Sequence, residues 1–187
     1  ANLGASIAVK KLGTTSINKD EIYKVSKEYN KSKIISPKNL SNNINKWRDN
    51  NLIIGFTNGC FDLVHAGHID MLEKASKACD KLIVAINSDQ SIRKLKGKKR
   101  PILDLKSREK LLRSLQVVDL VISFDEITPI KLIKKIKPNV LFKGADYKTE
   151  EIVGADFIKK NGGSVIRIAL TKNQSTSNLI SKLNNNN

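Results

Sequence analysis

The chain has 187 residues, of which 40% are hydrophobic and 28% charged, and its formal net charge is +16 at pH 7. This length allows one substantial folded domain with a small appendage, and no apolar run approaches the roughly 20 residues that a membrane-spanning helix needs. With neither a membrane span nor a secretory signal pattern, the sequence predicts a cytoplasmic protein.

The positive charge is spread along the chain rather than gathered in one motif. Nucleic acid is the usual partner of so basic a protein. However, only 5% of the residues are aromatic, and no helix-turn-helix, zinc-finger or aromatic-basic pattern is present. We therefore expect a few phosphate-binding lysines among many solvated ones, and no nucleic-acid partner. Cys60 and Cys79 lack metal-ligand spacing, so we expect reduced thiols and no metal site made by the protein itself.

The first 50 residues fall into two stretches. Residues 1–12 carry small and apolar residues at helical spacing, and Gly13 would end such a helix. Residues 17–50 are rich in lysine and asparagine and predict a linker that becomes the first helix of the main domain. In that helix Leu40, Ile44 and Trp47 would face the core.

From residue 52 onward, short apolar runs alternate with helical patterns. Strands are expected at 52–56, 82–86, 120–122, 140–142 and 164–168. Helices are expected at 68–79, from Ser107 as cap through Leu115, from Thr128-Pro129 to Pro138, at 149–160 and at 177–183. The basic run 93–100 is expected in a long connection. The alternation predicts an α/β fold: a Rossmann-like five-stranded parallel sheet with helices on both faces, plus a helical N-terminal extension.

The first predicted strand leads into residues 57–62 and then into a helix that opens with His65 and His68, the two histidines of the chain. Three residues apart at a helix start, their rings can face the same side, and Gly67 lets a ligand approach the backbone closely. Ligands bind at the carboxyl edge of such sheets, and free N–H groups at a helix start attract phosphate. The pattern predicts a phosphate site; the plainer alternative is that the histidines cap the helix or pack in the core.

These residues resemble the H-x-G-H signature of the nucleotidyltransferase superfamily, which includes the cytidylyltransferases and phosphopantetheine adenylyltransferase. A narrower match adds Asn87-Ser88-Asp89, residues 143–147 and Ser175-Thr176-Ser177. Together they are similar to the adenylyltransferase domain of the bifunctional heptose 7-phosphate kinase and heptose 1-phosphate adenylyltransferase. The resemblance covers residues 36–183 and leaves 184–187 as a disordered tail. Residues 1–35 resemble the end of a sugar-kinase domain and a linker, so we expect a kinase domain upstream in the full-length protein.

The resemblance implies transfer of AMP from ATP to heptose 1-phosphate, giving ADP-heptose and pyrophosphate for lipopolysaccharide core synthesis, with Mg²⁺ arriving with ATP. His65 and His68 would donate hydrogen bonds to the triphosphate and the transition state. Lys96, or its neighbour Lys94, would close on the phosphates. The residues expected to bind nucleotide are Thr57, Asn58, Gly59, Phe61, Asp62, Gly67, Lys143, Gly144, Asp146, Ser175, Thr176 and Ser177. Asp89 and Arg108 are expected to bind the sugar phosphate.

Other interpretations remain open at this point. One is a cytidylyltransferase acting on glycerol 3-phosphate or another small phosphate, and a second is a basic nucleotide- or nucleic-acid-binding module without turnover. Arg108 could also be an exposed helix residue paired with Glu109. The sequence does not fix the sugar, its anomer, the nucleotide base or the assembly state, for which a homodimer is among the alternatives.

Overall fold

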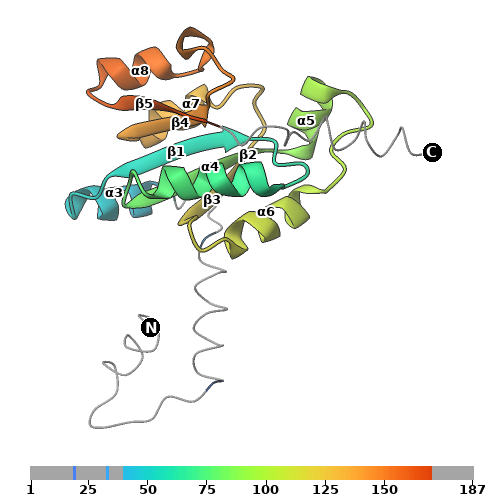
Figure 1. Cartoon of the computed structure of the whole chain (residues 1–187), viewed down its shortest axis with the longest axis horizontal. Helices are drawn as coiled ribbons and strands as arrows, with labels where there is room; N and C mark the ends of the chain where they lie inside the picture. The colour runs from blue at the N-terminus through green and yellow to red at the C-terminus, as the bar shows by residue number, and fades with distance from the viewer. Residues whose placement is uncertain (1–18, 20–32, 34–39, 170–187) are drawn as a thin grey trace.

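The computed structural model describes Lys19, Lys33 and residues 40–169 of the chain (Figure 1). The helices expected at 1–12 and 177–183, the boundary at residue 36 and the tail at 184–187 lie outside the described residues. So do Ser175, Thr176 and Ser177, three of the residues expected to bind nucleotide.

A single parallel sheet forms the centre of the fold (Figure 1). Its strands are β1 (Ile54–Gly59), β2 (Lys81–Asn87), β3 (Leu120–Phe124), β4 (Val140–Gly144) and β5 (Ser164–Ile168). They lie in the order β3-β2-β1-β4-β5, and Phe56 of β1 pairs with Ile83 of β2 on one side and Leu141 of β4 on the other. The chain runs outward from β1 to β3 and then crosses to the other side of β1, where it forms β4 and β5. The point at which the order reverses lies between β1 and β4. Such a switch point is where open α/β sheets bind ligands.

Helices cover both faces of the sheet, as the sequence predicted. They are α3 (Leu40–Asp49), α4 (Ala66–Ser76), α5 (Asp89–Lys96), α6 (Leu105–Ser114), α7 (Ile130–Ile136) and α8 (Ala155–Lys160), with a 3₁₀ turn η1 (Thr149–Glu151) before α8. No helix within the described residues is long and apolar enough to cross a membrane.

Two apolar clusters fill the space between the sheet and its helices. Residues that alternate along β2 go to opposite clusters: Ile83 and Ala85 to one, Leu82 and Val84 to the other. The first cluster includes residues of α3, α7 and α8, and the second includes residues of α4 and α6. Because both faces are covered, the strands are continuous apolar runs rather than alternating ones.

The face predicted for the first helix of the domain is confirmed in α3. Leu40 and Ile44 are buried, and Trp47 packs against the same cluster. In α7, Ile133 and Ile136 are fully buried, and the helix ends at Lys137, just before Pro138, in a left-handed conformation with φ of 44°.

Four strands extend further toward the sheet's carboxyl edge than predicted: β2 reaches Asn87 and β3 reaches Phe124, and β1 and β4 are longer as well. β1 begins at Ile54 rather than at residue 52, and it includes residues 57–59, which were expected in the loop beyond it. β4 likewise continues through Lys143 and Gly144. The polar residues Thr57 and Asn58 remain in the ladder because they pair with Val84 and Ala85 of the longer β2. The polar ends of these strands are thereby held rigidly by the sheet.

The prediction of a long connection over residues 93–100 is wrong for 93–96, because residues 89–96 form α5, and holds for 97–100. Ser88 caps this helix by accepting a hydrogen bond from the backbone N–H of Ser91, and Ile92 is fully buried. The remaining arginine and lysines are good helix formers although they add no apolar stripe. Gly97, with φ of 91°, ends the helix.

Two other helix starts differ from prediction. The N-cap of α6 is Asp104, whose carboxylate accepts from the backbone N–H of Ser107 at 2.8 Å, so Ser107 lies inside the helix instead of capping it. The helix expected at 149–160 is split, because Gly154 takes a left-handed conformation, φ 91°, between η1 and α8. α4 begins at Ala66, two residues before the predicted start, with His65 as its N-cap.

Candidate functional site

A cavity of about 620 Å³ opens where β1, β2 and β4 end. The predicted site residues that line it are Thr57, Asn58, Gly59, Phe61, Asp62, His65, Gly67, His68, Lys96, Lys143, Gly144 and Asp146. Sequence reasoning did not assign site roles to six further lining residues: Cys60, Met71, Asn87, Leu95, Ile127 and Tyr147. The structure therefore brings most of the predicted site to one place.

The two histidines lie side by side at the start of α4. Their ring centroids are 3.9 Å apart, with the ring planes tilted by 42°. The backbone N–H of His65 donates to Nδ1 of His68 across 3.4 Å. The His68 ring also lies 5.1 Å from the ring of Phe61, centroid to centroid. His68 is thus next to a buried aromatic ring as well as the neighbouring imidazole.

Both imidazoles are neutral near pH 7. Burial, with His65 and Lys96 as smaller causes, lowers the pKa of the His68 imidazole to about 4. Burial also lowers the pKa of His65 below its ordinary value. Because Nδ1 of His68 accepts a hydrogen bond, the single ring proton of its neutral form lies on Nε2. Nε2 of His68 is therefore a hydrogen-bond donor.

The cavity wall contains buried polar atoms that have no hydrogen-bond partner among the described residues. These atoms are Oγ1 of Thr57, Oδ1 of Asn58 and Nδ1 of His65. Thr57 is only 1% exposed, and buried polar groups in native proteins nearly always have partners. The geometry is that of a site completed by a polar ligand.

The turn after β1 has a strained backbone. Phe61 has φ of 47°, which non-glycine residues rarely adopt, yet its side chain is only 3% exposed. Its ring packs so close to Gly59 that a Cβ on Gly59 would come within 3.1 Å of it. Such strain is found most often at functional sites, where the surrounding packing maintains it.

Two lysines bring positive charge to the cavity from different sides. Lys143 of β4 donates from Nζ to the backbone carbonyl of Asn58 at 2.9 Å, and Nζ lies 5.4 Å from the centre of the Tyr147 ring. Burial lowers the pKa of Lys143 to about 8, against the opposing effects of Cys60 and Asp146, so it is still mostly protonated at pH 7. Lys96, in the last turn of α5, is exposed and lines the cavity.

Lys94 and Lys96 were alternatives for the same role in the sequence. Lys96 is among the residues that line the cavity, and Lys94 is not. Both lie on α5, which sequence reasoning missed. Their positions on this helix determine that Lys96 and not Lys94 lines the cavity.

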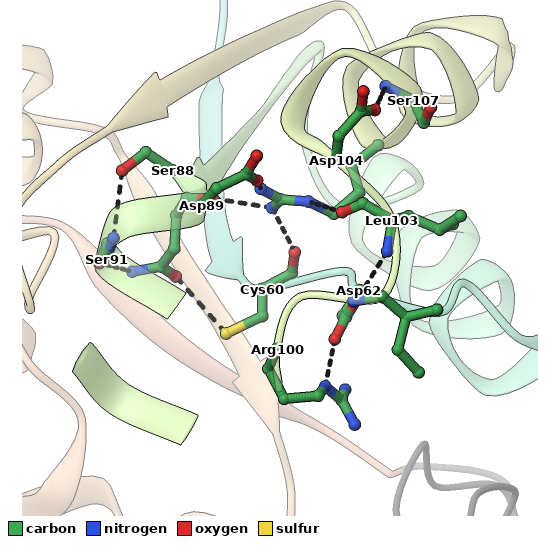
Figure 2. Close-up of polar contacts among 12 residues, drawn as sticks. Cys60, Asp62, Ser88, Asp89, Ser91, Arg100, Leu103, Asp104 and Ser107 are labelled. Atoms are coloured by element: carbon green, nitrogen blue, oxygen red, sulfur yellow. Dashed lines mark hydrogen bonds and ion pairs between the residues drawn. The ribbon is translucent and has the colours of Figure 1, made fainter. Parts of the chain in front are cut away.

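The Asp62 carboxylate turns toward the connection between α5 and α6 (Figure 2). It accepts hydrogen bonds from Nε of Arg100 and from the backbone N–H groups of Ile102, at 2.6 Å, and Leu103, at 3.1 Å. The side chain of Asp62 is 1% exposed. Its oxygens therefore fix a neighbouring segment, although the residue also lines the cavity.

Arg108 and Asp89, both expected at the sugar phosphate, do not line the cavity. They pair with each other, with Nη2 of Arg108 2.6 Å from Oδ1 of Asp89. The alternative of an exposed arginine paired with Glu109 is wrong, because the Arg108 side chain is 0% exposed. This guanidinium is therefore enclosed by the protein next to the cavity.

Comparison with known proteins then places the chain. The profile of the family described as Cytidylyltransferase-like matches residues 56–181. The chain belongs to this cytidylyltransferase-like family. The match includes the whole H-x-G-H turn and every strand of the sheet except the first two residues of β1.

Relatives within the family extend beyond this chain. It is 43% identical over 190 residues to "Bifunctional protein HldE" of Rhodopseudomonas palustris (strain BisA53), covering 99% of this chain and 39% of the relative. It is 44% identical over 188 residues to the protein of the same name from Caulobacter vibrioides, covering 98% of this chain and 39% of that one. The chain therefore spans about two fifths of the length of these relatives.

Solved structures show the same architecture. A lipopolysaccharide core biosynthesis protein from Thermoplasma volcanium GSS1 is 32% identical, with a TM-score of 0.52, over 66% of this chain and 99% of that one. A pantoate-beta-alanine ligase from Francisella tularensis, solved with β,γ-ATP and β-alanine, has a TM-score of 0.53 over 80% of this chain and 77% of that one. Its 20% identity supports a shared fold alone.

For a member of the cytidylyltransferase-like family, the chemistry of this cavity is that of an anion site. Neutral imidazoles donate hydrogen bonds, Lys96 and Lys143 supply positive charge, and the first turn of α4 presents backbone N–H groups. None of these groups is arranged as a nucleophile next to a base. The arrangement can bind a polyphosphate and stabilise charge that develops on it.

Proposed function

We propose that this chain is an adenylyltransferase that transfers AMP from ATP to heptose 1-phosphate, releasing pyrophosphate and forming ADP-heptose for the lipopolysaccharide core. Its nucleotidyltransferase domain would comprise residues 36–183 and would follow a sugar-kinase domain of which residues 1–35 are the end. Two similarities support this assignment: the HldE proteins of Rhodopseudomonas palustris and Caulobacter vibrioides are 43% and 44% identical over nearly the whole chain, and the Thermoplasma protein is named a lipopolysaccharide core biosynthesis protein. We place the reaction in the cytoplasm, where ATP is available.

One observation carries the proposal: two neutral imidazoles, with centroids 3.9 Å apart, lie at the first turn of α4 on the wall of the cavity. In the reaction, an oxygen of the sugar phosphate forms a bond to the α-phosphorus of ATP, and the bond to the pyrophosphate breaks with its electron pair. Negative charge builds on the oxygens around that phosphorus. Nε2–H of His68 and the imidazole of His65 would donate hydrogen bonds to those oxygens, an effect that belongs to the transition state.

Lysines and backbone groups would hold the rest of the nucleotide. Lys96 and Lys143 would neutralise the phosphates, and the backbone of residues 57–62 would wrap them. Thr57 Oγ1 and Asn58 Oδ1 would gain the partners that the protein does not give them. Asp146 and Tyr147, at the β4 end of the cavity, would face the nucleoside. Ser175, Thr176 and Ser177 would reach the triphosphate.

Mg²⁺ would enter with ATP, as it does in most enzymes that use this nucleotide. It neutralises the phosphates when bound. Among the described residues, no group of three or more His, Cys, Asp or Glu side chains could hold a metal ion. Of the two carboxylates that line the cavity, Asp62 is engaged by Arg100 and two backbone N–H groups, and Asp146 is exposed. Since Asp146 is assigned to the nucleoside, the phosphates of ATP and water would hold the ion.

A pyrophosphate-release assay on the 187-residue chain tests the proposal. ATP, CTP and GTP are each paired with heptose 1-phosphate and with glycerol 3-phosphate. We expect release with ATP and heptose 1-phosphate, and its loss in His65→Ala and His68→Ala. Glu73→Ala, an exposed change on the same helix, is the control. Activity with CTP alone would contradict the base assignment, and salt-sensitive nucleic-acid binding without any turnover would contradict the enzyme assignment.

A further inference from the structure

Arg108 of α6 is a fully buried cation outside the cavity, and each of its guanidinium nitrogens has a partner. Nε donates to the carbonyl of Leu103 at 3.1 Å. Nη1 donates to the carbonyls of Cys60 at 2.8 Å and Asn87 at 2.7 Å. Nη2 donates to Oδ1 of Asp89 at 2.6 Å. Figure 2 labels three of these partner residues, Cys60, Asp89 and Leu103, which come from separate segments of the chain.

The partners of this guanidinium belong to separate segments that meet beside the cavity. Cys60 follows β1 and leads into the turn that carries the histidines, whereas Asn87 ends β2; both line the cavity. Asp89 is the first residue of α5, and Lys96 is the last residue of the same helix. Backbone hydrogen bonds between residues four apart fix the positions of the helix residues relative to one another. Anchoring its first residue therefore limits where Lys96 can lie.

Further contacts make this anchoring firm. Nδ2 of Asn87 donates to Oγ of Ser91 at 3.0 Å, and that hydroxyl donates to the carbonyl of Glu126 at 2.8 Å. Beyond α5, Leu103 is held twice, by Asp62 at its N–H and by Arg108 at its carbonyl. Both ends of the segment that carries Lys96 are thus tied to the core around one guanidinium.

We propose that Arg108 is a positioning residue that fixes helix α5, and with it Lys96, at a set distance from the histidine-bearing turn. It controls the rate of transfer without touching either substrate. The side chain has no exposed surface with which to meet a phosphate, and four of its five guanidinium N–H groups already donate to protein acceptors. A lysine in its place offers one point charge on a flexible stem, which cannot reproduce the planar fork.

The catalytic part of this proposal rests on the proposed adenylyltransferase activity, and Arg108→Lys tests it. A displacement of catalytic groups by about 1 Å costs on the order of 100-fold in rate, so we expect kcat to fall about 100-fold. The KM for the sugar phosphate should stay within about threefold, because Arg108 does not contact it. The control is Arg113→Lys, the same change on a partly exposed residue of α6. A large rise in KM for the sugar phosphate with kcat unchanged would mean direct substrate contact and would overturn the proposal.

A double-mutant cycle with Lys96→Met separates positioning from general damage. If Arg108 acts by placing Lys96, the double variant Arg108→Lys/Lys96→Met should lose little more kcat than Lys96→Met alone. Fully additive losses would overturn the proposal. Should Arg108→Lys not fold, Asp89→Asn replaces it in the same cycle, because the Asp89 side chain is 26% exposed and its loss leaves the guanidinium in place.

Amide hydrogen exchange supplies a readout that does not need activity. In Arg108→Lys the amides of residues 92–97 should exchange faster than in the unaltered chain, while those of β4 keep their rate. Unchanged exchange across α5 would overturn the positioning role. A chain that releases no pyrophosphate with any phosphate acceptor would overturn the proposed function, whereas faster exchange in α5 would still support the anchoring by Arg108.

Discussion

Two polar clusters lie next to each other at the carboxyl edge of this sheet, and they differ in how fully their atoms are hydrogen-bonded. Around Arg108 and Asp62 each charged group has partners, from backbone groups as well as from other side chains. On the cavity wall, Thr57 Oγ1, Asn58 Oδ1 and His65 Nδ1 have none among the described residues. Satisfied groups maintain shape, and unsatisfied ones lower the stability of the free protein and gain partners from a ligand. Residue type alone would not separate the two clusters.

The largest predicted effect is the loss of stability when the buried cation of Arg108 is removed from the fully hydrogen-bonded cluster. Arg108→Met leaves three backbone carbonyls and the Asp89 carboxylate without their donor. Loss of one partner from a buried ion pair costs about 3–5 kcal/mol. We expect that decrease in the free energy of unfolding, measured by urea titration. Arg113→Met is the control, and an equal loss in both variants would contradict a special role for Arg108.

Removing an imidazole should affect the reaction rather than the fold. For His68→Ala we expect kcat to fall by a factor of about 10²–10³, the range for loss of one donor to a developing oxyanion. The free energy of unfolding should fall by only about 1 kcal/mol. Pyrophosphate release and urea titration measure the two quantities. A variant that loses stability but keeps its kcat would show that His68 maintains the fold, as Arg108 and Asp62 do.

Asp62→Asn tests a residue that lines the cavity but whose carboxylate is hydrogen-bonded to the α5–α6 connection. The amide group cannot accept from Arg100 and two backbone N–H groups together, so we expect a loss of about 1.5–3 kcal/mol in the free energy of unfolding. The Kd for ATP should change by less than about threefold, because the side chain faces the α5–α6 connection. Urea titration and calorimetric nucleotide binding measure these effects, with exposed Asp125→Asn as control. A large loss of ATP affinity at unchanged stability would reverse the assignment.

Thr57→Val removes an unsatisfied hydroxyl while keeping the shape of the side chain. We expect the free energy of unfolding to rise by about 1 kcal/mol, because no hydrogen bond is lost and a buried polar atom disappears. The affinity for ATP should fall by about fivefold, which corresponds to one hydrogen bond of about 1 kcal/mol. Thr128→Val, outside the cavity lining, is the control. Lower stability in Thr57→Val would show that its hydroxyl has a partner in the free protein.

The pH dependence of Lys143 gives the smallest effect. Its pKa in the folded chain is lowered to about 8 by burial, so kcat/KM for ATP should decline as pH rises through that value and the positive charge is lost. Between this pKa and the higher one of the unfolded chain, the unfolded state binds more protons, so stability should rise with pH there. Lys143→Arg, which stays charged, should abolish the decline. A decline that persists in this variant would assign it to another group.

The strands and the histidine turn could be predicted because their signals are local. Continuous apolar runs such as residues 82–86 mark buried parallel strands, and His65 and His68 are three residues apart on one helical turn. Helix α5 was not predicted because its sequence is mostly basic and polar, and Ile92 alone does not make an apolar stripe. Its extent is set by the Ser88 cap and by Gly97.

The role of Arg108 could not be predicted, since its partners are distant in sequence. They lie 5, 19, 21 and 48 residues away. The same holds for Asp62, whose acceptor oxygens meet residues 38 to 41 positions further on. Leu95 and Ile127 reach the cavity only because α5 and the end of β3 converge there. Contacts between residues so far apart in sequence depend on how the elements are arranged in space. Sequence patterns predict the elements but not these contacts.

The histidine pair offers the most direct test of the polyphosphate site, because the chain has two histidines and both belong to it. Nitrogen-15 NMR of the histidine side chains, recorded while Mg²⁺ and a non-hydrolysable ATP analogue are added, follows each ring by itself. We predict a neutral His68 with its proton on Nε2 in the free protein, and shifts of both imidazoles that saturate with the nucleotide. Imidazole signals that stay unchanged while the nucleotide binds would contradict the account.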